Sequence, residues 1–201
     1  MVAQGSWGKY SPPKPSPAQY YTLVTVLIAY SLLMGRQAGL QPTGEWRLFS
    51  WHPFLMTCGM VGFAGLGAVT KKLGGYANTK THGILGWLSL FCSFGGIYCI
   101  YRNKENNGYL HLSSPHAMVG TGVVISCVGL GLAGSIFLHP DFGMDKQNKT
   151  IRFAHKTASR LTLMLAWVTA FLGLFGIAAE NTLLLAAYGL PLVALVPFVL
   201  M

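Results

Sequence analysis

Six long apolar stretches separated by short polar turns restrict this chain more than any other feature. They cover roughly residues 18–35, 53–70, 83–101, 117–138, 157–179 and 182–201. Each approaches the ~20 residues that an α-helix needs to cross a ~30 Å hydrocarbon core. A lipid-exposed segment must satisfy its own backbone hydrogen bonds, and these stretches do not alternate as barrel strands do. The sequence therefore predicts an all-α membrane protein with six transmembrane helices.

The composition agrees with a chain that faces lipid. Its residues are 52% hydrophobic and only 9% charged, whereas soluble domains carry about 25% charged residues. The four cysteines all fall inside apolar stretches, so we expect buried free thiols rather than disulfides or a zinc site. The net charge of +9 comes from Lys and Arg in short loops. Membrane topology explains this charge, and no nucleic-acid partner is expected.

The predicted organisation is a polar arm followed by one domain. Residues 1–17 contain "SPPKPSP" and cannot fold alone, whereas residues 18–201 form a single six-helix transmembrane domain. Polar turn sequences such as "KKLGGYANTK" and "RNKENNGY" are expected to end the helices. The last span contains two prolines and could be kinked or partly interfacial.

The loop charges predict the orientation. We name the side that holds the N-terminus side A and the opposite side B, and six spans return the C-terminus to side A. Basic residues are concentrated on side A, where they are Lys9, Lys14, Lys71, Lys72, Lys80, Lys146, Lys149, Arg152, Lys156 and Arg160; side B has Arg36, Arg47, Arg102 and Lys104. The excess predicts that side A, with both termini, faces the cytoplasm, or the matrix or stroma of an organelle.

Four histidines occupy equivalent places in consecutive spans. His52, His82, His116 and His155 each stand at the N-terminal end of an apolar stretch, from the second to the fifth. Consecutive spans run antiparallel, so these ends alternate between the two membrane faces. We therefore expect His52 with His116 near side B, and His82 with His155 near side A.

Two imidazoles on different helices at each face are what a six-coordinate haem iron requires. Spans two to five would then form a central four-helix bundle with two b haems inside it. One turn after the histidines come Met56, Gly86, Gly120 and Ser159. All except the methionine are small enough to border a flat macrocycle. A single histidine at a helix end is more often a packing residue, and the haem prediction depends on the constellation of four.

The layout resembles the eukaryotic cytochrome b561 family, in which four central spans each carry one haem-ligating histidine. "LFSWHPFLM" is especially similar to the branch of the human candidate tumour-suppressor member, and "THGILGW", "SPHAMVG" and "AHKTASRL" resemble the other three histidine motifs. The resemblance covers about residues 18–200. It implies an oxidoreductase with two b haems that transfers electrons from cytosolic ascorbate to monodehydroascorbate or a ferric chelate across the membrane. The basic, tyrosine-containing ascorbate motif of better-known members is replaced here by "AVTKKLGGYANTK".

Charged residues near each face are candidates for binding small anions. Lys71, Lys72, Lys80 and Arg152 form a basic rim on side A, and Arg102, Lys104 and His111 lie on side B. Positive-inside topology alone also explains the side-A set. His139 is expected to be a loop histidine. Four aromatic residues, Trp87, Phe91, Phe94 and Trp167, are candidates to lie between the histidine pairs, although aromatic residues in spans are most often packing.

Two functional hypotheses follow from these observations. The first is a stand-alone transmembrane electron-transfer oxidoreductase with a small redox donor and acceptor, alone or as a homodimer. The second is an accessory haem-bearing or structural subunit of a larger respiratory or photosynthetic membrane complex. Lipid is the expected surrounding in both.

Overall fold

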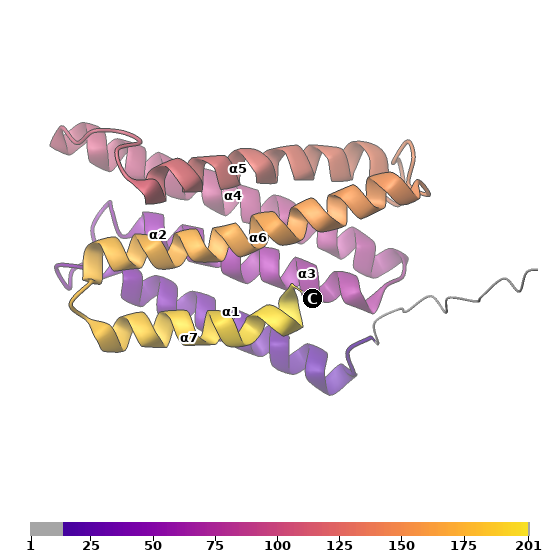
Figure 1. The fold of residues 1–201 in the computed structure, drawn as a ribbon, viewed down its shortest axis with the longest axis horizontal. Coiled ribbons are helices and arrows are strands. Elements are labelled where there is room, and N and C mark those ends of the chain that lie inside the picture. Colours follow the sequence, from indigo (N-terminus) through magenta and orange to yellow (C-terminus); the bar gives the residue numbers. More distant parts are fainter. Residues whose placement is uncertain (1–13, 201) are drawn as a thin grey trace, which may run out of the picture.

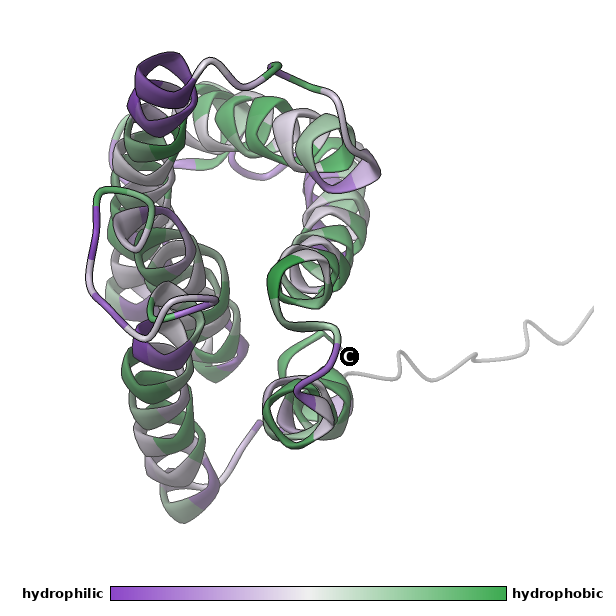
Figure 2. Ribbon diagram, turned by 90° about the vertical axis from the view of Figure 1, so that its left-hand side faces the viewer, coloured by the Kyte–Doolittle hydropathy of each residue, from purple (hydrophilic) through white to green (hydrophobic). Residues whose placement is uncertain are grey.

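The computed structural model describes residues 14–200, and most of the predicted arm, residues 1–13, lies outside the described residues. Within the described part, six helices are long and apolar enough to cross a membrane, which confirms the predicted all-helical membrane fold. These helices run side by side in alternating directions (Figure 1). Hydrophilic residues gather at helix ends and in loops, as the view along the helices shows (Figure 2).

Local sequence signals mark the start of the first span and the end of the second. Helix α1 is Pro17–Gly39 and begins with a capping box, in which Ser16 and Gln19 each bond the other's backbone N–H. The second span is continuous from Trp51 to Leu73. It comprises α2 (Trp51–Met56), a π-helical segment η1 (Thr57–Phe63) and α3 (Ala64–Leu73). Gly74 and Gly75 then turn the chain with φ of 71° and 83°, values that favour glycine.

The third and fifth spans are longer than the apolar stretches predicted. Helix α4 is Tyr76–Asn107, with 32 residues, and α6 is Lys149–Ala178, with 30 residues. At ~1.5 Å per residue each exceeds a ~30 Å hydrocarbon core. The expectation that "YANTK" and "RNKENN" are turns was therefore wrong. These polar residues continue the helix outside the lipid, and only the glycines beside them break it.

The remaining spans match their predicted limits more closely. The fourth span comprises α5 (Pro115–Ala133) and a second π-helical segment, η2 (Gly134–Leu138). Ser114 caps α5 by accepting the N–H of Ala117, and Asn148 caps α6. Helix α7 is Thr182–Val199 and continues through both of its prolines.

The outer helices α1 and α7 lie together along one edge of the bundle, and α5 lies along the opposite edge (Figure 1). The hydroxyl of Tyr30 on α1 donates to the carbonyl of Tyr188 on α7 at 2.6 Å. The Tyr188 hydroxyl in turn bonds Thr57 of η1 at 2.9 Å, and Tyr188 is 2% exposed. These buried bonds join both outer helices to the second span, which leaves the second to fifth spans to build the centre.

Candidate functional site: two histidine pairs

The histidine pair near side B comes from the starts of α2 and α5. His52 and His116 are each the second residue of their helix. Their ring centres are 6.1 Å apart. The Nδ1 of His52 lies 3.0 Å from the Gly96 carbonyl of α4, and the Nδ1 of His116 lies 2.8 Å from the Thr169 carbonyl of α6. The predicted side-B pairing is thus present in the structure.

The second pair lies toward side A and comes from α4 and α6. The ring centres of His82 and His155 are 6.4 Å apart. The Nδ1 of His82 lies 2.9 Å from the Gly67 carbonyl of α3, whereas the Nδ1 of His155 is buried without a hydrogen-bond partner among the described residues. More than one helical turn precedes each of these histidines, because α4 and α6 begin with polar residues. This pair therefore lies deeper within its helices than the predicted helix ends implied.

The helices that share a pair are not packing neighbours. The second span packs chiefly on α1 and α4, and α5 packs chiefly on α6. The rings of each pair therefore meet across the bundle, α2 with α5 and α4 with α6, and a planar group held between them would be bordered by all four helices.

Both pairs fit a metal-centred cofactor. A carbonyl can only accept a hydrogen bond, so the Nδ1 of His52, His82 and His116 carries the proton and Nε2 is left with a free lone pair. Two imidazoles bound at ~2 Å on opposite sides of one metal ion have ring centres roughly 6 Å apart. The observed separations of 6.1 and 6.4 Å agree with that arrangement.

Two glycines that the sequence analysis missed make room for the rings. A Cβ on Gly173 would lie 2.6 Å from Cε1 of His116, and a Cβ on Gly134 would lie 3.1 Å from Cε1 of His155. Each glycine lies on a helix facing its histidine, so spacing along one helix could not reveal it. The carbonyl acceptors Gly67, Gly96 and Thr169 were missed for the same reason.

The small residues predicted beside the histidines have different surroundings. Gly86 is exposed, and a Cβ on it would meet no atom within 4 Å, so this position is not packed against another helix. Gly120 instead packs against Thr169, where a Cβ would lie 3.3 Å from Cγ2. Ser159 is half-buried, and Met56 packs against Gly96.

Met60 of η1 separates the two pairs at the centre of the bundle. Its carbonyl accepts the indole N–H of Trp167 at 3.2 Å, and its sulfur accepts Ser89 at 3.9 Å and Cys127 at 4.0 Å. All four central spans therefore meet at this residue. Of the other candidate aromatic residues, Trp87 bonds Ser135, whereas Phe91 and Phe94 are 65% and 45% exposed.

The basic residues of the side-A rim have different interaction partners. The ammonium of Lys72 caps α7 by donating to the Phe198 carbonyl, and Lys80 pairs with Asp141 at 3.0 Å. Lys71 donates to Thr79, repels Arg152 as a like charge, and lies within electrostatic reach of both histidines of the side-A pair. The structure thus brings the Lys71 charge to this pair, with Arg152 near Lys71, and assigns the other two lysines local partners.

The loop before α6 is held against the start of α4. Asp141 accepts hydrogen bonds from the Tyr76 hydroxyl and the Lys80 ammonium, and these two bonds hold the pKa of its carboxyl below the usual range. His139 lies in the same loop, where it stacks on Phe142, as expected for a loop histidine.

The predicted side-B residues lie on the end of α4 and the loop after it. Lys104 lies within electrostatic reach of His52 and donates to the Leu110 carbonyl. His111 bonds Glu105 at 2.7 Å and stacks on Tyr101. Arg102 is exposed. Of these three side-B residues, Lys104 is thus the one whose charge lies within reach of a histidine pair.

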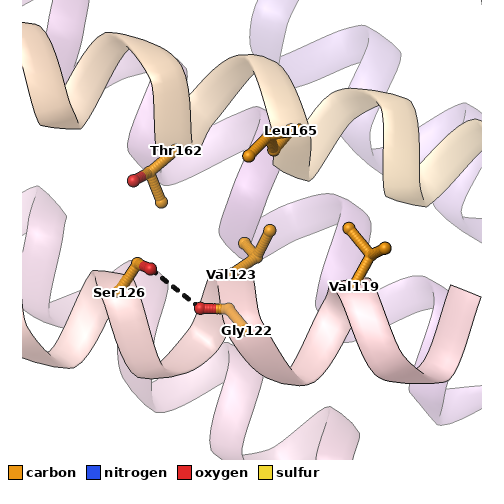
Figure 3. A pocket seen from close by; sticks show the side chains of 6 residues that line it. All are labelled: Val119, Gly122, Val123, Ser126, Thr162 and Leu165. Atoms are coloured by element: carbon orange, nitrogen blue, oxygen red, sulfur yellow. Dashed lines mark hydrogen bonds between the residues drawn. The ribbon is translucent and has the colours of Figure 1, made fainter.

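A pocket of about 290 Å³ lies between α5 and α6 (Figure 3). Its lining consists of Val119, Gly122, Val123, Ser126, Thr162 and Leu165. The Ser126 hydroxyl is directed to the Gly122 carbonyl, and the lining contains no titratable group. This pocket therefore offers space for an apolar group but no acid–base chemistry.

The sequence profile described as "Eukaryotic cytochrome b561" matches residues 51–179, the segment that carries both histidine pairs. The chain belongs to this family. Membership confirms the resemblance seen in the four histidine motifs and implies haem b as the cofactor. The fit of the two pairs to a metal-centred group, derived above from the ring positions, agrees with that cofactor.

Three named mouse and human proteins are similar to this chain. The chain is 27% identical to the mouse "Transmembrane reductase CYB561D2" over 139 residues, which cover 65% of this chain and 62% of the relative. It is 26% identical to the human protein of the same name over 136 residues, covering 63% and 61%. It is 30% identical to the mouse "Lysosomal membrane ascorbate-dependent ferrireductase CYB561A3" over 111 residues, covering 52% and 46%. The chain thus spans about three fifths of the CYB561D2 proteins and about half of the ferrireductase.

Proposed function

We propose that this cytochrome b561 protein is an oxidoreductase that carries electrons across a membrane through two b haems. His52 and His116 would hold one haem, and His82 and His155 the other. The observation that supports this most directly is the spacing of the rings in the two histidine pairs, one toward each end of the bundle. Their ring centres are 6.1 and 6.4 Å apart, which fits one iron in each pair. A bound haem iron supplies one-electron redox chemistry.

The protein's own residues would fix the ligands and keep the sites apart. Backbone carbonyls hold three of the rings in the tautomer that leaves Nε2 free, and such bonds also increase the basicity of a ligating histidine. Met60 and Trp167 fill the bundle between the sites and exclude water there. Electrons would therefore pass between the two sites through packed side chains.

The donor would be a small anion such as ascorbate on side A. Lys71 supplies positive charge within reach of the side-A pair, Arg152 lies near Lys71, and both residues are exposed. Positive charge in this position raises the local concentration of an anion and speeds its encounter. The printed name of the CYB561A3 relative, an ascorbate-dependent ferrireductase, supports ascorbate as the first donor to test.

The acceptor would be an anion on side B, such as monodehydroascorbate or a ferric chelate. Lys104 provides positive charge near His52, and Arg102 and His111 lie on the same end of α4 and its loop. The excess of basic residues at the opposite end supports an orientation in which side A, with both termini, faces the cytoplasm or an equivalent compartment.

Haem counting in histidine variants tests the two-site proposal. Purified wild type should contain two haems per chain, and His52→Ala and His82→Ala should each retain one, with different spectra. The control is His139→Ala, because this loop histidine stacks on Phe142 away from both pairs. One haem per wild-type chain, or an equal loss in the control, would refute the assignment. Reduction of a trapped ferric chelate by external ascorbate in proteoliposomes then tests transfer across the membrane.

A further inference from the structure

A carboxylate neutralises one member of the basic rim on side A. Lys71, Lys80 and Arg152 are exposed, and Lys71 donates to Thr79, the residue before Lys80. In the part of the chain that the structure describes, no carboxylate lies within ion-pair distance of Lys71 or Arg152. Lys80 differs, because its ammonium lies 3.0 Å from the Asp141 carboxylate. The protein itself therefore supplies the anion that Lys80 binds.

Three side chains from two elements form this contact. Tyr76 and Lys80 lie one turn apart on α4, and the Lys80 ammonium is 5.7 Å from the centre of the Tyr76 ring. Asp141 accepts hydrogen bonds from both the Lys80 ammonium and the Tyr76 hydroxyl. Lys80 comes two residues before His82, a distance of about 3 Å along the helix axis. The contact therefore lies beside the side-A pair, toward the surface from which a donor would approach.

The loop that carries Asp141 is shaped by its own hydrogen bonds. Backbone N–H groups after Asp141 donate to carbonyls before it, from Gly143 to His139 at 2.9 Å, from Met144 to Ile136 at 2.9 Å and from Asp145 to Phe137 at 3.1 Å. A Cβ on Gly143 would lie 2.5 Å from the His139 carbonyl oxygen, so the turn has no room for a side chain. The loop thus presents Asp141 to Lys80 in a preorganised position, which reduces the entropy cost of forming the ion pair.

We propose that Asp141 determines the donor specificity of the side-A site by competing with anionic donors for Lys80. This inference rests on the proposed function and adds to it a residue that selects donors by charge. An anionic donor that pairs with the Lys80 ammonium must displace Asp141, whereas a neutral donor meets no such competition. The side chains of Lys80 and Asp141 are 47% and 36% exposed, and an ion pair this exposed is weak enough for an external anion to replace it. Asp141 therefore slows anionic donors without affecting neutral ones.

The experiment follows haem reduction by stopped flow in the haem-loaded full-length protein, with ascorbate or trimethylhydroquinone as the donor. Ascorbate is a monoanion at neutral pH, whereas the hydroquinone is uncharged. Asp141→Asn retains the size of the side chain and an acceptor for Tyr76 but removes the charge. The matched control is Asp145→Asn, which removes the same charge from the same loop. Asp145 accepts a hydrogen bond from the Asn148 side chain at 2.8 Å and does not pair with Lys80.

Asp141→Asn should raise the second-order rate constant for ascorbate by about two- to fivefold, the range by which an exposed ion pair shifts an equilibrium. It should leave the rate constant for the hydroquinone unchanged, and Asp145→Asn should change neither. In a Lys80→Gln background the effect of Asp141→Asn should disappear, because no ammonium remains for the donor to bind.

Three results would overturn the inference. These are an unchanged rate constant for ascorbate in Asp141→Asn, a gain that persists in the Lys80→Gln background, and an equal gain with both donors. The last result would mean that the substitution loosens the loop rather than releasing a charge. A wild-type protein whose haem ascorbate does not reduce would refute ascorbate as the donor in the proposed function and this inference with it, so the two failures can be told apart.

Discussion

Substitution of Gly173 by alanine should selectively remove the haem proposed for the His52–His116 pair. The added Cβ would lie 2.6 Å from Cε1 and 2.9 Å from Nδ1 of His116. Carbon atoms pack favourably at about 3.5–4.0 Å, so the ring must retreat by about 1 Å. That movement would lengthen the 2.8 Å bond from His116 to the Thr169 carbonyl beyond hydrogen-bonding distance. Overpacking of this kind costs about 1–3 kcal/mol, which corresponds to roughly 5- to 150-fold weaker haem binding.

The matched control for this prediction is Gly176→Ala, on the same helix. A Cβ at Gly176 would meet no atom within 4 Å, and alanine is the better helix former by about 1 kcal/mol. Haem-to-protein ratios during dilution, together with spectra of the reduced protein, measure both variants. Gly173→Ala should lose the side-B haem and keep the other, while Gly176→Ala keeps both. Two firmly bound haems in Gly173→Ala would show that the ring does not sit as the structure has it.

Three further perturbations test other parts of the structure. Trp167→Phe removes the indole donor to the buried Met60 carbonyl, which should destabilise the fold by about 0.5–1.5 kcal/mol; an unchanged melting temperature would contradict this. Lys71→Gln combined with Arg152→Gln should slow haem reduction by ascorbate, measured by stopped flow, and should abolish the salt dependence of that rate. The haem spectra should not change. A salt dependence equal to that of wild type would mean that these two residues only help to set the membrane orientation. Asp141→Asn should expose the loop before α6 to limited proteolysis at pH 7. Because the pKa of this carboxyl is lowered in the folded protein, its stabilising effect is present above the ordinary carboxyl pKa and is lost as pH falls through the folded value. The difference from wild type should therefore disappear in acid, and a difference that persists there would point to another cause.

Much of the architecture follows from the sequence because membrane helices obey simple length and period rules. Apolar stretches of about 20 residues predict the spans, and the histidine positions along antiparallel spans predict which rings share a depth. Both pairings appear in the structure, His52 with His116 and His82 with His155. The helix ends were less predictable. The residues Tyr76–Lys80 are polar, yet they continue α4, because polarity marks the edge of the lipid rather than the end of a helix.

Depth along a span follows from the ~1.5 Å rise of each residue, so the sequence by itself determined which imidazoles share a level, but not how far the His82–His155 pair lies inside its helices. The lateral arrangement of the helices depends instead on how side chains from different spans interlock. Only the tertiary structure could therefore show that each pair joins helices from opposite sides of the bundle. It also showed that Gly134 and Gly173 lie close to the histidine rings and that Lys80 forms an ion pair with Asp141. Three histidines have a carbonyl acceptor for Nδ1, whereas His155 has none among the described residues. Each of these contacts joins residues from two different helices or loops, and no spacing within one helix encodes it.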